Sequence, residues 1–433
     1  MFHLALQLAF YLLVPRRSHS KKSNRIVSNE LFKLSFRIGG IQKRLTFLVS
    51  QAARCFYWPI ALKNIEVDVY NESPILVFDG VYQSKPHRER FLNFYGNQED
   101  RTYVFRDEVF GFISLSDRIT YLLMSMLLLP LTILAQNGSF LGRVFSLRLL
   151  LEVRALEVIA TKSSCKKIYM FNTFEPDANW MAKTLMSQGI NVVKIPSEVP
   201  LKFHNEYLIC SELVICNEYQ REELEKFAET QEIGVVSKIW GPESSARVFD
   251  RYREIEFHPQ TRVGFYSSGG WLRAKLLHWE GEQKKMMEEQ SIGEVVKAIR
   301  ELGIDDLLVF LHPREKLHDH IGMTKAYYAD LGVRMNINIK LEETPSSDCF
   351  EKTHLGLTTL STIAYERVFF GFPTLILDKS TMDFPIPSSP FSNLYVKDPC
   401  LLQSEIKNAL QQTRVEFYES RNLRHHQHPD ILL

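Results

Sequence analysis

The chain has 433 residues, of which 45% are hydrophobic and 24% charged, so it is long enough for two globular domains. Its net charge of +1 excludes the strong overall attraction to nucleic acid that a basic protein shows. The six cysteines are scattered without a C-x-x-C pair, which favours a reduced, cytoplasmic protein over a disulfide framework.

The first predicted segment, residues 1–60, is basic and apolar. Residues 4–14 are apolar, too few to span a bilayer comfortably, and they are followed by Arg16, Arg17 and further basic residues. This pattern is typical of peripheral attachment to anionic lipid, so we expect residues 4–14 to contact a membrane surface. A second apolar run, residues 121–135, contains Pro130, and we expect it to form a buried core helix.

The first domain, residues 61–245, is predicted to alternate strands with helices. Short β-branched or aromatic runs bounded by turn residues predict strands at residues 65–69, 75–78, 103–105, 167–171, 192–195 and 213–216. Helical patterns are found at residues 140–163, 178–188 and 219–229. This alternation is typical of a parallel sheet covered by helices on both faces.

A polar stretch, residues 242–262, separates this domain from a second one, residues 262–433. The second domain is predicted to have strands at residues 263–266, 307–311, 334–340, 355–360 and 373–377. Its predicted helices run through residue 302, then over residues 319–331 and 363–370, with one more from residue 402. We therefore predict two doubly wound, Rossmann-like α/β domains, which bind ligands beyond the carboxyl ends of their strands.

The loop after the first strand of the second domain is a candidate ligand site. It contains Ser268, Gly269 and Gly270, and glycines let a backbone approach a ligand closely and turn N–H groups toward it. A Gly-Gly pair is also a common turn, so the sequence leaves both interpretations open.

The strand at residues 307–311 is followed by His312 and Pro313. A histidine there can donate a hydrogen bond to a phosphate, and Arg314 would add a cation. The alternative is a histidine whose ring is satisfied by the backbone at a loop start.

Ser361 and Thr362 stand before the helix at residues 363–370, where hydroxyl and N–H groups can bind an anion. An ordinary helix cap is the alternative, and the two roles are compatible. Glu366, one turn further, is a candidate for the ribose hydroxyls or for a simple pair with Arg367.

Three carboxylates in the first domain are candidate general bases, because they follow predicted strands. Glu175 comes first and Asp177 second, although Asp177 is also well placed as a helix cap. Asp79 is the third, in an Asp-Gly pair for which a turn is the favoured interpretation. The chain contains no D-x-D motif, which favours chemistry without a metal ion.

Together, the His312-Pro313 pair, the Ser361-Thr362 pair and the S-S-G-G loop resemble the donor-binding half of GT-B glycosyltransferases over roughly residues 263–378. The resemblance is to bacterial sialyltransferase-like and Kdo-transferase-like groups, which use CMP-activated sugars. In such families the histidine and the hydroxyl pair hold the CMP phosphate. F-E-P-D-A-N-W, which contains Glu175, is similar to the segment with the catalytic glutamate of Kdo transferases but lacks its Trp-Pro order. Phe78-Asp79-Gly80 has one acid of the sialyltransferase D/E-D/E-G motif.

The resemblance implies an inverting, metal-independent enzyme of lipopolysaccharide or capsule biosynthesis. It would move a sialic-acid-like sugar or Kdo from a CMP-sugar to a glycan or glycolipid acceptor, with no cofactor beyond the donor and no nucleic-acid partner. Its expected location is cytoplasmic, at the inner face of the bacterial inner membrane. Two alternatives remain: a UDP-sugar transferase or UDP-sugar 2-epimerase of the same fold, and a non-catalytic membrane-associated scaffold.

Overall fold

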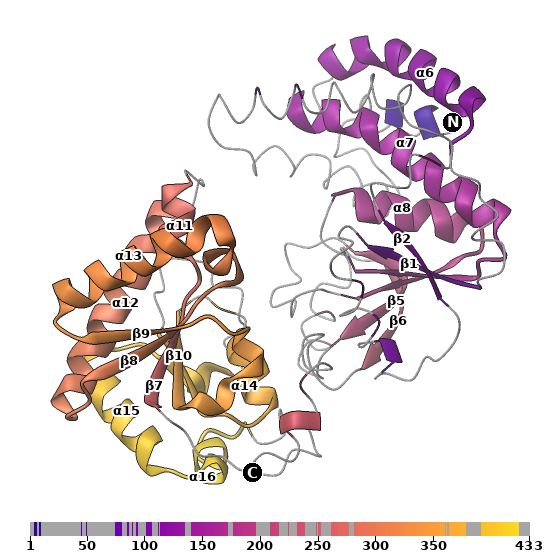
Figure 1. The fold of residues 1–433 in the computed structure, drawn as a ribbon. Coiled ribbons are helices and arrows are strands. Elements are labelled where there is room, and N and C mark those ends of the chain that lie inside the picture. The colour runs from indigo at the N-terminus through magenta and orange to yellow at the C-terminus, as the bar shows by residue number, and fades with distance from the viewer. Residues whose placement is uncertain are drawn as a thin grey trace. The chain divides into compact units, whose positions relative to one another are not determined.

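The chain folds into two compact units, Met1–Ile239 and Trp240–Leu433, in a computed structural model (Figure 1). The structure describes residues 74–79, 101–105, 113–134, 140–171, 176–195, 208–215, 232–238, 250–252, 261–276, 281–359, 361, 363–377 and 391–423, with isolated positions elsewhere, including 4–6, 8 and 9.

The first unit contains a six-stranded sheet in the order β2-β1-β3-β4-β5-β6, and each neighbouring pair is parallel. Its strands are β1 (Ile75–Asp79), β2 (Arg101–Phe105), β3 (Lys167–Met170), β4 (Asn191–Lys194), β5 (Ile209–Ile215) and β6 (Glu232–Lys238). The described helices of this unit are α6 (Leu115–Leu134), α7 (Phe140–Lys162) and α8 (Pro176–Ser187). Figure 1 shows α6 lying along the outside of α7, away from the sheet.

The second unit contains another six-stranded parallel sheet, in the order β12-β11-β10-β7-β8-β9. Its strands are β7 (Thr261–Tyr266), β8 (Asp306–Phe310), β9 (Asn338–Glu342), β10 (Thr353–Thr358), β11 (Thr374–Leu377) and β12 (Tyr395–Val396). Its helices are α11 (Gly270–Lys275), α12 (Gly281–Glu301), α13 (His318–Met335), α14 (Ile363–Phe369), α15 (Leu402–Gln411) and α16 (Arg414–Glu419). Short 3-10 turns occur at η8 (Pro313–Lys316), η9 (Ser346–Asp348), η10 (Phe350–Lys352), η11 (Phe391–Leu394) and η12 (Pro399–Leu401). The predicted fold of two doubly wound α/β domains is confirmed.

Some predicted elements differ from the structure for local reasons. The predicted strand at residues 334–340 begins later, because α13 continues to Met335 and ends at Asn336, whose φ of 51° is left-handed. The predicted tail helix is two helices, because Thr413 forms a capping box with Glu416 that starts α16. β6 was not predicted. The strand predicted at residues 65–69 and most of the helix predicted at residues 219–229 lie outside the described residues.

Part of the predicted boundary stretch, residues 242–262, belongs to the core of the second unit. Tyr252 is buried, donates a hydrogen bond to the Ser347 carbonyl at 2.7 Å, and accepts one from the Phe350 N–H at 2.9 Å. Val248 lies in the same buried cluster. Residues that precede β7 in the sequence therefore pack into the core of the second unit.

Both apolar runs contribute side chains to the core of the first unit. Leu4, Ala5 and Leu8 are buried in one core cluster of the first unit, so these described positions of residues 4–14 contribute to packing. The expected core helix, now α6, buries Tyr121 and Leu128 but leaves an apolar face exposed. Among the described residues, no helix has the length and apolar character that crossing a membrane requires.

Candidate functional site

The predicted donor-binding motifs meet at one edge of the second sheet. The S-S-G-G loop follows β7, His312 follows β8 and Ser361 follows β10, and β7 pairs with both other strands. The chain runs from β7 through β8 to β9 on one side of the sheet and from β10 onward on the other. The sheet therefore changes direction between β7 and β10, and the carboxyl edge at such a switch point is where open α/β sheets bind ligands.

His312 is held by its own short turn. It caps η8 with Pro313 at the first position, and its Nδ1 accepts a hydrogen bond from the Arg314 N–H at 3.2 Å. Burial, followed by nearby cations, lowers the pKa of the His312 imidazole to about 4, so the ring is neutral at physiological pH. With Nδ1 accepting, the proton of the neutral ring is on Nε2, which is then a hydrogen-bond donor.

Four cations act electrostatically on this neutral ring. Arg273 on α11, Arg314 and Lys316 on η8, and Lys284 on α12 all act electrostatically on His312. Only Arg314 was predicted from the sequence, because the other three come from helices whose basic residues look like an ordinary solvated face. This cluster favours an anion beside His312, since opposite charge is stabilising there.

The S-S-G-G loop touches His312 but does not present its amides to a ligand. The Ser268 and Gly270 N–H groups each donate to the Glu288 carboxylate at 2.8 Å, and the Gly269 N–H donates to the Ser267 hydroxyl at 2.9 Å. The predicted backbone anion cradle is thus occupied by a carboxylate of the protein itself. Glu288 is buried, and nothing in the charged helical pattern around it signals this role.

Steric constraints explain why the loop has glycine at both of these positions. Gly269 has a φ of 68°, and a Cβ there would lie 3.2 Å from His312 Cγ. A Cβ on Gly270 would lie 2.7 Å from the backbone carbonyl carbon of Lys284, so α11 and α12 could not approach as they do. The loop therefore forms a fixed wall against one side of the His312 ring.

A second buried carboxylate, that of Glu315, accepts a hydrogen bond from the His312 backbone. Glu315 accepts hydrogen bonds from the His312 N–H at 2.7 Å, from the Tyr328 hydroxyl at 3.2 Å, and from the Trp271 indole N–H. Burial, followed by the neighbouring Glu288, raises the pKa of the Glu315 carboxyl to about 7. Glu315 was not predicted from the sequence. The signal that could have identified it is the H-P-R-E spacing, in which Glu315 closes a capping box on His312.

Ser361 acts as a helix cap. Its hydroxyl accepts a hydrogen bond from the Ile363 N–H at 3.4 Å, and its own N–H donates to Thr358 Oγ1 at 3.3 Å. Thr362 lies outside the described residues. Glu366 is half-buried on α14.

The suggested Glu366–Arg367 pair is not the arrangement found for Arg367. The Arg367 guanidinium is fully buried and bonds Tyr266, Thr374 and two backbone carbonyls. Arg367 therefore supports the sheet beneath the site.

Two of the candidate bases, Asp79 and Asp177, lie at or after the ends of strands at the corresponding edge of the first unit's sheet. Asp79 is the last residue of β1, which pairs with β3 in parallel, and Asp177 lies in the first turn of α8 after β3. The chain passes from β1 to β2 on one side and from β3 onward on the other, so this edge is also a switch point. Glu175 lies outside the described residues.

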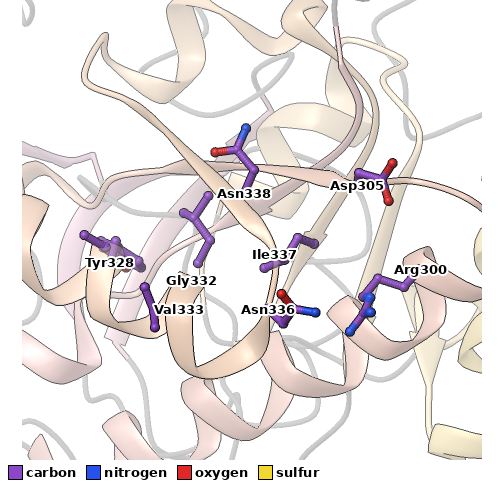
Figure 2. A pocket seen from close by; sticks show the side chains of 10 residues that line it. Arg300, Asp305, Tyr328, Gly332, Val333, Asn336, Ile337 and Asn338 are labelled. Atoms are coloured by element: carbon purple, nitrogen blue, oxygen red, sulfur yellow. The ribbon is translucent and has the colours of Figure 1, made fainter.

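A separate pocket lies at the opposite edge of the second sheet. Figure 2 shows it between the end of α12, the end of α13 and the starts of β8 and β9, with a volume of about 730 Å³. Its lining mixes polar and aliphatic residues, among them Arg300, Asp305, Asn336 and Asn338. None of the predicted site residues lines it.

No family model matches the chain, and no curated protein matches it in sequence. Solved structures resemble it in fold. A UDP-GlcNAc 2-epimerase from Methanocaldococcus jannaschii covers 81% of this chain and 97% of its own, at 10% identity and a TM-score of 0.44. A putative UDP-N-acetylglucosamine 2-epimerase from Listeria monocytogenes covers 81% of this chain and 90% of its own, at 12% identity and a TM-score of 0.47. MurG from Acinetobacter baumannii covers 83% of this chain and 96% of its own, at 10% identity and a TM-score of 0.44. At these identities and TM-scores, the similarities assign neither an activity nor a donor to this chain.

Proposed function

We propose that this chain is a GT-B glycosyltransferase that takes its sugar from a nucleotide-sugar donor and holds the donor phosphate at His312. The observation that carries the proposal is the neutral imidazole at the carboxyl edge of β8, with Nε2–H as a donor and four cations that act on it electrostatically. A neutral donor in such a positive field favours a phosphate oxygen, whose charge the cations offset without a proton transfer.

A CMP-linked donor is the finer proposal. The loop amides of Ser268, Gly269 and Gly270 have internal acceptors, so they add no backbone donors for a second phosphate. His312 with its cations suits a single phosphodiester, as in a CMP-activated acidic sugar. Ser361 and Thr362 would assist from the end of β10, and Glu366 is the candidate for the ribose hydroxyls.

The proposed reaction is inverting transfer. A carboxylate of the first unit, Glu175 or Asp79, removes the proton from an acceptor hydroxyl, with Asp177 as the third candidate. The acceptor oxygen then bonds to the anomeric carbon while the bond from that carbon to the phosphate oxygen breaks. CMP leaves with its negative charge stabilised at His312. The acceptor would be a glycan or glycolipid at the inner face of a membrane.

The test is a calorimetric titration of the purified chain with CMP, CDP, UDP and GDP, followed by the same titrations of His312→Ala. We expect CMP to bind most tightly and the variant to bind it at least about tenfold more weakly, since a hydrogen bond to a charged group contributes about 1.5–3 kcal/mol. His318→Ala is the matched control, because His318 is an exposed histidine at the start of α13.

Each other outcome has a definite meaning. Tighter binding of UDP would replace the CMP proposal with the UDP-sugar transferase or UDP-sugar 2-epimerase alternative. Binding that is equal in wild type and His312→Ala would refute the assignment of His312. Absence of binding by any nucleotide would favour the non-catalytic scaffold.

A further inference from the structure

The outer face of α6 is a continuous apolar surface. Six side chains on it are between 52% and 77% exposed, and we call them the α6 stripe: Leu115, Ile119, Leu123, Met126, Leu127 and Leu134. Their spacing of mostly three or four residues places them along one side of the helix. The other side carries the residues that pack into the unit, such as Tyr121 and Leu128.

The α6 stripe carries no charge. The only charged residues of α6 are Asp117 and Arg118, both in its first turn. Asp117 forms an ion pair with Arg154 of α7, and the Arg118 guanidinium donates to the Ile113 carbonyl at 2.9 Å. An exposed run of aliphatic side chains of this length marks an interaction surface.

The first unit, to which α6 belongs, also contains a strongly basic stretch of sequence. Residues 1–60 contain ten Lys and Arg residues and a single acidic residue, Glu30. Leu4 and Leu8, near the start of this segment, belong to the same core cluster as Tyr121 and Leu128 of α6. Figure 1 shows the N-terminus next to α6 and α7.

We propose that the α6 stripe docks onto an anionic lipid membrane, with the basic segment of residues 1–60 pairing with lipid headgroups. An uncharged aliphatic helix face, in a unit whose sequence also contains a basic segment, is the combination that binds an anionic bilayer surface. Protein interfaces are enriched in aromatic residues, Met and Arg, and of these the stripe contains only Met126. We therefore assign lipid contact to α6, whereas Leu4 and Leu8 pack in the core of the same unit.

The test is flotation of the full chain with vesicles of phosphatidylcholine alone and of phosphatidylcholine mixed with phosphatidylglycerol. We expect binding to the mixed vesicles, weakened by added salt. The double variant Leu123→Gln/Leu127→Gln should partition roughly tenfold more weakly for each leucine, since both side chains are more than half exposed. The matched control is Val333→Gln on α13, an 82% exposed aliphatic residue of the other unit.

A second pair of variants tests the basic segment. Arg16→Gln and Arg17→Gln should each reduce binding to the mixed vesicles by about fivefold and leave binding to pure phosphatidylcholine unchanged. Met126→Gln is a milder stripe variant, to be used if the double variant does not fold.

Three results would overturn the proposal. One is no binding of the wild type to mixed vesicles, and the second is equal binding by wild type and stripe variants. The third is self-association of the wild type, measured by light scattering, that the stripe variants abolish without any vesicle binding. In that third case the stripe joins two copies of the chain.

Discussion

Replacing Gly356 by alanine should destabilise the second unit strongly. Gly356 lies in β10, and a Cβ built on it would lie 2.5 Å from Arg367 Nε, 2.8 Å from Arg367 Cζ and 2.9 Å from a ring carbon of Tyr266. These separations are shorter than real Cβ contacts, so the guanidinium must move or the strand must shift. Glycine is required here because a buried arginine lies across the strand.

The cost follows from what holds the guanidinium. Arg367 is fully buried and donates to Thr374 Oγ1, the Tyr266 hydroxyl and the Phe350 and Pro373 carbonyls, at 3.1, 2.5, 3.2 and 3.1 Å. A hydrogen bond from a charged group contributes about 1.5–3 kcal/mol, so losing two of the four costs about 3–6 kcal/mol. Domains are typically stable by only about 5–15 kcal/mol.

The assay is guanidinium chloride unfolding, together with hydrogen exchange of peptides from β7 and β10. The matched control is Gly293→Ala in the interior of α12, where the nearest atom, Met335 Cε, is 3.7 Å from the added Cβ. That variant should be neutral or about 0.5–1 kcal/mol more stable. A loss of less than about 1 kcal/mol for Gly356→Ala would refute the reasoning, as would simple additivity with Arg367→Met.

Two further predictions concern titration. The raised pKa of Glu315 means that the folded unit holds a proton that the unfolded chain loses near pH 4.5. Stability should therefore fall by up to about 3 kcal/mol as the pH rises from 5 to 8, and unfolding of Glu315→Gln across that range should show a flatter pH dependence. His312 should titrate near pH 4 by NMR in the ligand-free chain, and its pKa should rise when CMP or inorganic phosphate binds, because the anion stabilises the imidazolium. A His312 pKa that CMP and phosphate leave unchanged would place the phosphate elsewhere.

The fold was largely predictable because most strands are short, β-branched and buried. β4 and β10 illustrate this, since almost every residue in them is buried. β6 was missed because it is an edge strand in which Glu232, Gly234 and Val235 are exposed, so its pattern has neither alternation nor a continuous apolar run.

For the candidate site, only the positions that follow from chain order were predictable. The placement of His312 and Ser361 at one edge of the second sheet was predicted because each follows a buried strand of that sheet. The partners of the S-S-G-G loop were not found, because Glu288 lies in a charged helix and no local pattern separates a buried glutamate from a solvated one. The exposed apolar face of α6 was not predicted, because hydropathy along a sequence does not reveal which face of a helix packs inward.

The attachment of the S-S-G-G loop to Glu288 bears on how tightly the site can hold a small ligand. A loop that wraps its amides around a ligand must first lose conformational freedom, and that entropy is subtracted from the affinity. Here the ordering is completed during folding, since three hydrogen bonds to Glu288 and the close approach of Gly270 to α12 fix the loop before any ligand arrives. The S-S-G-G loop beside His312 is thus preorganised. In the proposed donor site it would contribute a fixed surface that does not rearrange when the ligand binds.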